Sequence, residues 1–312
     1  MATLSELPFV YPMHRMAVSL IGAAPDPERM FDLYRRAWRK IGGDQVALTR
    51  FHARLICDLR DKIPATIFHF GVWEPEISHV IAALLDDGDV FVDIGANIGY
   101  YSLLASRLVG SSGAVVAIEA SPRTYARLQA NLRVNRADNV RPVNVAASDE
   151  AGQVTIYSGP RQNSGAASTL KEWRNGEAEA VVTALPLDQI LTVRERGKVR
   201  LVKIDVEGAE APILAQLLSS IDAYPDDMGI IVELSPDAGA DAWEAAFSGF
   251  LAKGFKAFGI TNEYDDSWYL NWRRPAGIHP LASCPAGKLD VLFTRRAPPD
   301  AVSAVGGGRS AR

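Results

Sequence analysis

Short apolar segments alternate with amphipathic ones through the middle of the chain. Residues 90–94, 114–118 and 140–145 are short and largely apolar, as expected of strands in a buried sheet. Between them, apolar side chains recur at helical spacing from 100 to 108, and again after Ser121, which has the residue type of a helix cap. This order of strands and helices predicts a parallel, doubly wound sheet.

The same alternation returns in the second half of the chain after an interruption. Residues 154–185 lack helical spacing and predict a β excursion away from the main sheet. Four further strands are predicted, at 199–204, 228–232, 255–260 and 288–294. The last of them completes a sheet of seven strands, and residues 262–287 before it are predicted to form a long loop.

The N-terminal part has helical spacing without intervening strands. Asp26 and Pro27 have the residue types of a helix start, and Gly42 and Gly43 end that pattern. A second helix is predicted over 46–59, and another begins at Pro75. We therefore divide the chain into three parts. They are a helical extension or lid at 1–69, a main domain at 70–296, and a disordered tail rich in Pro, Gly, Ser and Ala at 297–312.

Composition and charge narrow the class of protein. The chain has 312 residues, 48% of them hydrophobic, as expected of a globular protein with a substantial core. Its net charge of −4 does not support a nucleic-acid partner, which usually needs a basic face. Its two cysteines form no C-x-x-C pair, and it has neither a basic leader nor a long apolar run. We expect a cytoplasmic protein without membrane insertion, and the oligomeric state stays open.

The stretch from Asp93 to Gly99, with the sequence D-I-G-A-N-I-G, is the strongest candidate for a ligand site. It joins a predicted strand to a predicted helix, where backbone N–H groups and the helix N-terminus face a ligand. The third glycine of the dinucleotide fingerprint is absent. A carboxylate just before the turn favours a cationic or zwitterionic ligand over a pyrophosphate. S-adenosylmethionine, which has a sulfonium and an ammonium group, is such a ligand, and a purely structural turn is the alternative.

Four carboxylates lie at or near the ends of predicted core strands. They are Asp93, Glu119, Asp205 and Glu233. Ligands of open α/β sheets bind outside the carboxyl ends of the strands, so we expect these acids to share one cleft. Burying like charges together is costly unless a cation or hydrogen-bond donors share the site. Glu119 also follows Gly99 by twenty positions, the spacing of the acid that meets a ribose diol in nucleotide folds.

These residues resemble the FkbM family of S-adenosylmethionine-dependent methyltransferases over about residues 70–295. The resemblance rests on residues 74–75, 93–101, 119–122, 144–148 and, most specifically, 203–210 (K-I-D-V-E-G-A-E). It implies an α/β, Rossmann-like class I methyltransferase fold with an antiparallel seventh strand. It also implies S-adenosylmethionine as methyl donor and, usually, O-methylation of a hydroxyl on a sugar, glycan or natural product. Residues before 65 and at 262–287 match poorly, so the acceptor itself is not implied.

The resemblance and the acid and glycine pattern together give a set of cofactor-binding candidates. They are Glu74, Asp93, Gly95, Asn97, Gly99, Glu119, Ser148 and Asp205. Asp93 is expected to accept from the ammonium group, and Ser148 to border the adenine. Asn97 is equally well explained as a helix cap, and Glu74 as a favourable charge at a helix N-terminus. A polar loop at 163–168 also matches the family and is expected to border the site.

Asp205 is the leading catalytic candidate, with Glu207 beside it. A hydroxyl acceptor must lose its proton, and either carboxylate or a histidine is chemically able to take it. A divalent metal held by Asp205 with Glu207 or Glu233 is a less favoured alternative, because no histidine spacing supports it. Two other functions stay open. One is a nicotinamide-dependent oxidoreductase, disfavoured by the missing glycine, and the other is a catalytically silent cofactor-binding module.

Overall fold

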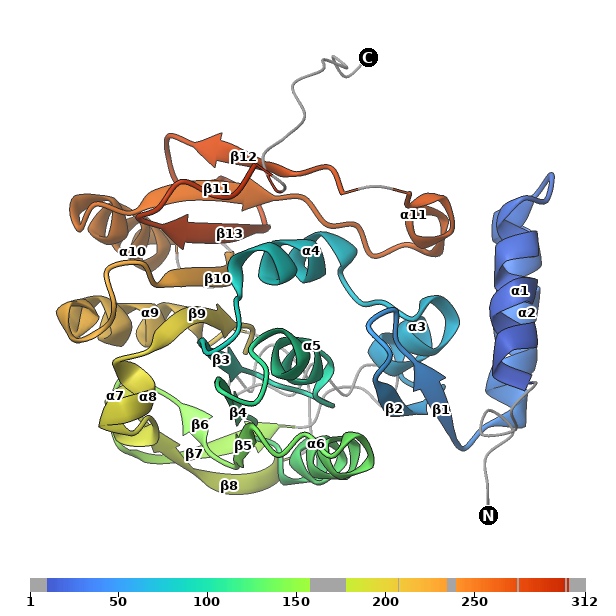
Figure 1. The fold of residues 1–312 in the computed structure, drawn as a ribbon, viewed down its shortest axis with the longest axis horizontal. Coiled ribbons are helices and arrows are strands. Elements are labelled where there is room, and N and C mark those ends of the chain that lie inside the picture. Colours follow the sequence, from blue (N-terminus) through green and yellow to red (C-terminus); the bar gives the residue numbers. More distant parts are fainter. Residues whose placement is uncertain are drawn as a thin grey trace.

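The computed structural model describes residues 10–157, 178–206, 208–234, 240–273, 275–300 and 302. Its centre is an eight-stranded sheet with the strand order β12-β11-β13-β10-β9-β3-β4-β5 (Figure 1). The strands are β3 (Val90–Ile94), β4 (Ala114–Ile118), β5 (Val140–Val143), β9 (Val199–Ile204), β10 (Gly229–Leu234), β11 (Lys256–Ile260), β12 (Ile278–Leu281) and β13 (Leu289–Thr294).

The sheet is mostly parallel, as predicted. Neighbouring strands from β5 through β4, β3 and β9 to β10 all pair in parallel. β13 is inserted antiparallel between β10 and β11, which confirms the expected antiparallel seventh strand. The predicted number of seven strands is wrong, because β12 adds an eighth strand at the edge beside β11. β12 and helix α11 (Asp266–Asn271) both lie within 262–287, so the prediction of one long loop is wrong there.

Helices cover both faces of this sheet (Figure 1). Phe91 of β3 belongs to a core cluster with side chains of α4 (Pro75–Leu84), α5 (Tyr100–Leu108) and α6 (Pro122–Asn135). Val90, Val92 and Ile94 belong to the other cluster, with α9 (Glu210–Ser219) and α10 (Ala240–Ala252). The side chains of one strand thus alternate between two cores, as the period of a β-strand requires.

The N-terminal part begins with two helices, α1 (Val10–Gly22) and α2 (Pro27–Ile41). Asp26 caps α2 as expected, since its side chain accepts a hydrogen bond from the Arg29 N–H. The helix predicted over 46–59 is wrong. Residues there form an antiparallel hairpin of β1 (Asp44–Leu48) and β2 (Arg54–Asp58), followed by α3 (Lys62–Phe70). Buried and less buried positions alternate along both strands, which is the strand period rather than the helical one.

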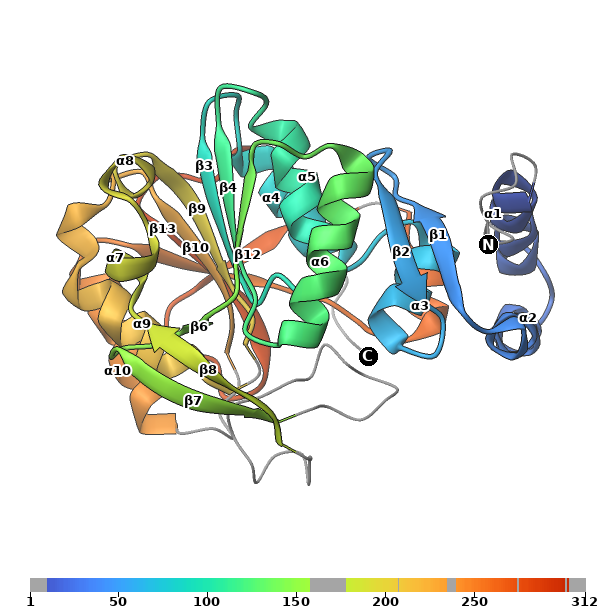
Figure 2. The same ribbon diagram turned by 90° about the horizontal axis from the view of Figure 1, so that it is seen from below.

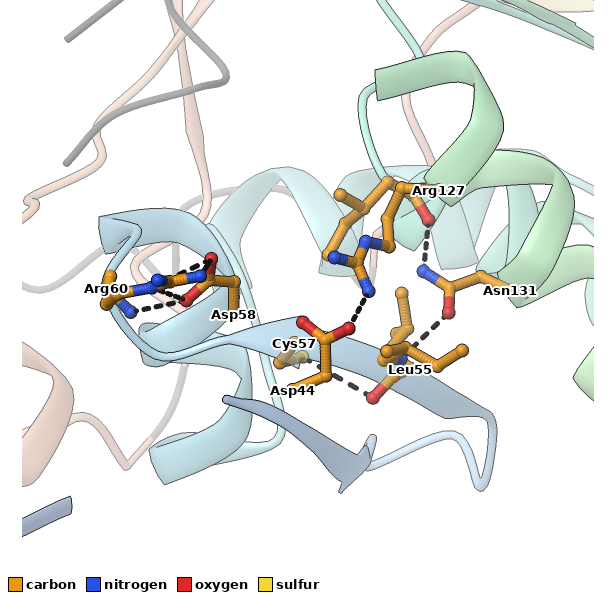
Figure 3. A network of polar contacts seen from close by, with 9 residues as sticks. Asp44, Leu55, Cys57, Asp58, Arg60, Arg127 and Asn131 are labelled. Carbon is orange, nitrogen blue, oxygen red and sulfur yellow. Dashed lines mark hydrogen bonds and ion pairs between the residues drawn. The ribbon is translucent and has the colours of Figure 1, made fainter. Parts of the chain in front are cut away.

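The hairpin is fixed to α6 through Asn131, a completely buried residue (Figure 3). Its Oδ1 accepts from the Ile56 N–H at 2.8 Å, and its Nδ2 donates to the Ile98 carbonyl at 2.8 Å. Arg127 of the same helix forms an ion pair with Asp44 at 2.5 Å. One asparagine therefore joins the hairpin, α6 and the turn after β3. The predicted domain boundary after residue 69 stays a prediction.

The remaining elements lie outside the central sheet (Figure 2). A second sheet of β6 (Ala146–Ala147), β7 (Gly152–Tyr157) and β8 (Ala178–Leu185) confirms the predicted β excursion. Short helices α7 (Leu187–Ile190) and α8 (Val193–Arg196) follow, and a 3-10 turn at Ile221–Ala223 comes after α9. The predicted disordered tail falls largely outside the described residues. Within the described part of the chain, no helix combines the length and hydropathy needed to cross a membrane.

Candidate active site

Three predicted acids lie at the carboxyl end of three adjacent strands. β3 is paired on one side with β9 and on the other with β4. Asp93 is in β3, whereas Glu119 and Asp205 directly follow β4 and β9. The Asp205 N–H donates to the Ile94 carbonyl at 3.0 Å, so the sheet pairing continues up to this residue. The three acids are therefore held next to one another by backbone pairing, as the strand-end pattern predicted.

The turn after β3 is shaped by its neighbours in the protein. Gly95 has a φ of +82°, and a Cβ there would overlap the carbonyl oxygen of Asp205. Gly99 has a φ of +92°, begins α5, and would bring a Cβ within 2.7 Å of Leu128 Cδ1. Both glycines are thus required by backbone geometry and packing, whether or not a ligand is bound.

A pocket with an empty volume of about 600 Å³ opens beside this turn. Four predicted residues line it: Gly95, Asn97, Glu119 and Asp205. The rest of the lining is mainly apolar and includes Ile94, Ile118, Ala146, Ala147 and Val206. Apolar walls with a few convergent polar groups are typical of a small-molecule site.

Glu119 is buried at the wall of this pocket and is fixed by two backbone donors. Its Oε2 accepts from the Asn97 N–H and its Oε1 from the Ser121 N–H, each at 2.9 Å. Burial raises its pKa to about 7, against the lowering effect of those two donors. Each oxygen retains a second lone pair, so an ionised Glu119 is able to accept from two ligand hydroxyls as well.

Two buried oxygen atoms near the turn have no hydrogen-bond partner within the described structure. They are Oδ1 of Asn97, a pocket-lining residue with a φ of +50°, and Oδ1 of Asp93. The other oxygen of Asp93 accepts from the Ser102 hydroxyl at 2.6 Å, and burial raises the pKa of this carboxyl. Since buried polar groups are normally paired, these acceptors fit a ligand that brings its own donors.

Lys203 is the cation at the centre of the acids. It is a buried residue of β9, and its Nζ lies 2.8 Å from Asp205 Oδ2 and 4.6 Å from the Tyr101 ring centroid. Burial alone would lower its pKa, but the charges of Asp205, Glu74 and Asp93 raise it overall. Lys203 therefore stays protonated and holds the carboxylate of Asp205 in one orientation.

Glu74 is a further buried acid that interacts electrostatically with Lys203. It accepts from the hydroxyl of Tyr101 at 2.5 Å and from that of Tyr264 at 2.8 Å. Burial and the charge of Asp205 raise its pKa to about 7, although Lys203 opposes the shift. Its φ of +40° is rare for a residue with a side chain, and such strain is concentrated at functional sites.

Two further acids adjoin this group. Asp290 of β13 is buried and accepts from the Asn262 side chain at 2.9 Å. Burial, together with the charges of Glu74 and Glu233, raises its pKa well above the usual range. Glu233, predicted at a strand end, lies within β10 and forms an ion pair with Lys288 at 2.8 Å. Across the described residues, no group of three or more acidic, His or Cys side chains has a metal-binding arrangement.

The other residues predicted for the site either do not line the pocket or lie outside the described residues. Ser148 follows β6 and donates to Asp149, and neither residue lines the pocket. Gly99, Asp93 and Glu74 also do not line it, although Asp93 and Glu74 are linked electrostatically to Asp205 through Lys203. Glu207 and the polar loop at 163–168 lie outside the described residues.

A second cleft, with an empty volume of about 1160 Å³, lies between α2, the start of α3 and the segment before α11. Basic side chains of Arg35, Arg39, Arg60 and Lys62 line it together with Asp61, Asp265 and Asp266. Tyr264 also lines it, and Lys62 Nζ lies 5.7 Å from the ring centroid of that residue. Because Tyr264 also contacts Glu74, one residue connects this cleft to the acids around Lys203.

Three residues of the site were not predicted to have a role, namely Lys203, Tyr264 and Asp290. For two of them the sequence contains a signal that could have indicated a role. Lys203 and Asp290 are charged residues inside largely apolar strands, and charged residues are rarely buried unless they are paired. Tyr264 gave no such signal, because its contact with Glu74 joins residues 190 positions apart.

The chain is similar to known proteins in sequence and in structure. A sequence model described as the Methyltransferase FkbM domain matches residues 93–257, more than half of the chain. The hexuronic acid methyltransferase AglP of Haloferax volcanii is 25% identical over 149 residues, which cover 47% of this chain and 58% of that protein. Protein-L-isoaspartate O-methyltransferase 2 of Archaeoglobus fulgidus is 32% identical over 71 residues, covering 22% and 32%. The chain thus spans less than two thirds of either relative.

Solved structures with a similar arrangement include two O-methyltransferases. The O-methyltransferase from Bacillus cereus in complex with SAH has a TM-score of 0.42 and 14% identity, covering 71% of this chain and 81% of that one. The SAM-dependent O-methyltransferase from Thermotoga maritima has a TM-score of 0.41 and 13% identity, covering 81% and 86%. At these values the likeness concerns the fold alone.

Proposed function

The chain belongs to the FkbM methyltransferase family, and we propose that it transfers a methyl group from S-adenosylmethionine to a hydroxyl of a sugar, glycan or natural product. The observation that carries this proposal is the pocket between the ends of β3, β4 and β9. There Glu119 and Asp205 face a space next to buried acceptor atoms that have no partner within the described structure.

The polar groups at and near the pocket fit S-adenosylmethionine in charge and in hydrogen bonding. Several acids gather around Lys203 and raise its pKa, and a further positive charge from a ligand would stabilise their ionised forms. We assign Glu119 to the ribose hydroxyls and the Asn97 side chain to donors at the amino-acid end, whereas Asp93, which does not line the pocket, acts on the ammonium group through its charge. The apolar walls formed by Ile118, Ala146 and Ala147 suit a flat, weakly polar ring.

When bound, S-adenosylmethionine supplies a methyl carbon that bonds to the acceptor oxygen as the carbon–sulfur bond breaks and its electron pair stays on sulfur. The protein contributes position and a proton acceptor. Asp205 lines the pocket, its side chain remains partly exposed, and Lys203 fixes one of its oxygens. We therefore assign to Asp205 the removal of the hydroxyl proton. Lys203 is a positioning residue, because it acts through Asp205.

One relative is named for an acidic sugar, and together with the second cleft it favours an acceptor that carries a carboxylate. AglP is named for methylation of a hexuronic acid. The cleft beside Tyr264 presents Arg39 and Lys62 alongside Asp61, Asp265 and Asp266, and the two cations are able to bind an anionic group. We propose that an acidic sugar enters from this side, with its hydroxyl directed toward Asp205.

Two experiments test the function. Purified protein is incubated with S-adenosylmethionine and a panel of neutral and uronic-acid saccharides, and mass spectrometry detects products that gain one methyl group. We expect methylated uronic acid, and no product with Asp205→Ala, while the variant still binds S-adenosylhomocysteine in calorimetry. Asp188→Ala, a change at an exposed acid on α7, is the matched control and should keep wild-type turnover.

Several results would refute this assignment. Wild-type turnover in Asp205→Ala would remove the proposed role of that residue. Micromolar binding of NAD without binding of S-adenosylhomocysteine would favour the oxidoreductase. Tight binding of S-adenosylhomocysteine without product from any acceptor would favour a silent cofactor-binding module.

A further inference from the structure

Exposed apolar side chains are concentrated on the two N-terminal helices. Ten large hydrophobic residues are exposed among the described residues, and six of them belong to α1 and α2. The six are Met13, Met16, Leu20, Met30, Leu33 and Ile41. Leu20 is 66% exposed and Met13 is 62% exposed. Single exposed hydrophobic residues are normal on a protein surface, but a group on one helical pair indicates an interaction site.

Each helix carries its exposed apolar residues as a stripe. Met13, Met16 and Leu20 follow the i, i+3, i+7 spacing of one face of α1. The opposite face, with Tyr11, His14 and Val18, is buried, and His14 stacks on Phe68 of α3. Figures 1 and 2 place both helices at one end of the molecule, on the far side of the β1–β2 hairpin from the central sheet. The stripe on α1 therefore faces outward.

The stripe on α2 is flanked by basic residues. Met30 and Leu33 continue to Ala37 and Ile41 at the same spacing, and Arg29, Arg36 and Lys40 each lie one position before a residue of that stripe. Residues 10–41 contain six basic and three acidic side chains, whereas the whole chain has a net charge of −4. The outward helical pair is thus the basic end of an acidic protein.

We propose that the α1–α2 pair is a docking surface for an anionic lipid bilayer, on which it lies without crossing. Apolar side chains would enter the interface while the neighbouring cations face lipid phosphates, which is the arrangement of interfacial amphipathic helices. Charge argues for this occupant over a second copy of the chain, because a symmetric dimer would bring two basic surfaces together. The proposal is independent of the methyl acceptor, and binding alone can test it.

The test is vesicle sedimentation with the full chain. Vesicles of 30% phosphatidylglycerol in phosphatidylcholine are compared with pure phosphatidylcholine, and bound protein is measured in the pellet. We expect clear binding to the anionic vesicles only. Because each basic residue near such a surface contributes about 1 kcal/mol, Arg29→Gln and Lys40→Gln should each weaken partitioning about fivefold. Met16→Glu and Leu33→Glu should abolish it.

Val193→Glu is the matched control, since Val193 is 79% exposed on α8, which is not part of the helical pair. This variant should bind like the wild type. Binding of S-adenosylhomocysteine and thermal unfolding check that each variant is folded. Equal losses for Val193→Glu and Leu33→Glu, or no preference for anionic vesicles, would overturn the proposal. A dimer seen by light scattering and abolished by Met16→Glu would overturn it in favour of a second copy.

Discussion

Glu119 allows the most direct test of the cofactor assignment. In the free protein its carboxyl has a pKa of about 7, and both oxygens already accept one backbone N–H. Only the ionised carboxylate is able to accept from two ribose hydroxyls at the same time. Binding of a ribose diol therefore favours the ionised form, and affinity should rise with pH until the carboxyl is fully ionised.

The size of the expected loss in affinity follows from the number of hydrogen bonds, and the size of the pH dependence follows from that pKa. In Glu119→Gln the charge is lost, and the amide nitrogen must face the N–H of either Asn97 or Ser121, which is a donor facing a donor. Hydrogen bonds to a charged group contribute about 1.5–3 kcal/mol each. A loss of about 2–3 kcal/mol corresponds to roughly 30- to 150-fold weaker binding. In the wild type, affinity should rise about tenfold from pH 6 to pH 8.

Isothermal titration calorimetry with S-adenosylhomocysteine measures both effects. This ligand lacks the sulfonium charge but keeps an ammonium group, and Glu74 also has a pKa of about 7. The ribose contact is therefore reported by the part of the pH dependence that Glu119→Gln removes. Glu150→Gln is the control, because Glu150 is exposed and does not line the pocket. Glu119→Gln should bind weakly, and its affinity should change less between the two pH values than that of the wild type. Wild-type affinity in Glu119→Gln, or a wild-type affinity that does not change with pH, would refute the assignment of Glu119 to the ribose.

Three further predictions concern stability. Gly95→Ala should lower the free energy of unfolding in urea by more than about 3 kcal/mol, because the new Cβ would overlap a backbone oxygen at a positive φ. Gly152 lies in open space, so Gly152→Ala should change the free energy of unfolding by about 0.5 kcal/mol or less. Asn131→Ala should cost about 2–4 kcal/mol, because it removes two buried hydrogen bonds. The pKa of Glu119 is raised on folding, so its contribution to stability is full below its unfolded pKa of 4.5 and is lost as pH rises through about 7. From pH 5.5 to pH 8.0 the wild type should therefore lose about 2 kcal/mol relative to Glu119→Gln.

Each of these stability predictions has an outcome that would contradict it. Equal unfolding free energies for the two glycine variants would mean that the turn can move away from Asp205. A cost for Asn131→Ala no larger than that of Asn271→Ala, a change at an exposed asparagine, would mean that the hairpin is held by other contacts. A wild type that gains stability relative to Glu119→Gln at high pH would reverse the sign of the pKa shift.

The parallel sheet and its acids were predictable because they rest on local patterns. A short apolar strand, a glycine turn and a carboxylate lie within a dozen residues, and parallel strands bring their carboxyl ends to one edge. The β1–β2 hairpin was mistaken for a helix, although Leu55, Cys57 and Leu59 are buried at every second position. Several of the intervening residues are also apolar, which weakens the contrast on which the strand period depends.

Contacts between distant segments could not be predicted from such patterns. Glu74 was linked to the site only by family resemblance, and its partner Tyr264 lies in a segment predicted to be a loop. Lys203 was visible as a charge within an apolar strand, but its location among Glu74, Asp93 and Asp205 depends on the order of the strands. The edge strand β12 has only four residues, two of them exposed, so it gives a weak apolar signal.

The contact between Gly95 and the carbonyl of Asp205 has a consequence for engineering. The loop proposed to receive the methyl donor and the loop that bears the proposed base fit together closely, because a Cβ at Gly95 would overlap the carbonyl of Asp205. A designer who transplants the donor motif into another scaffold must transfer both loops at their original spacing. Libraries that diversify acceptor choice should accordingly leave this junction untouched and vary the rim around Tyr264.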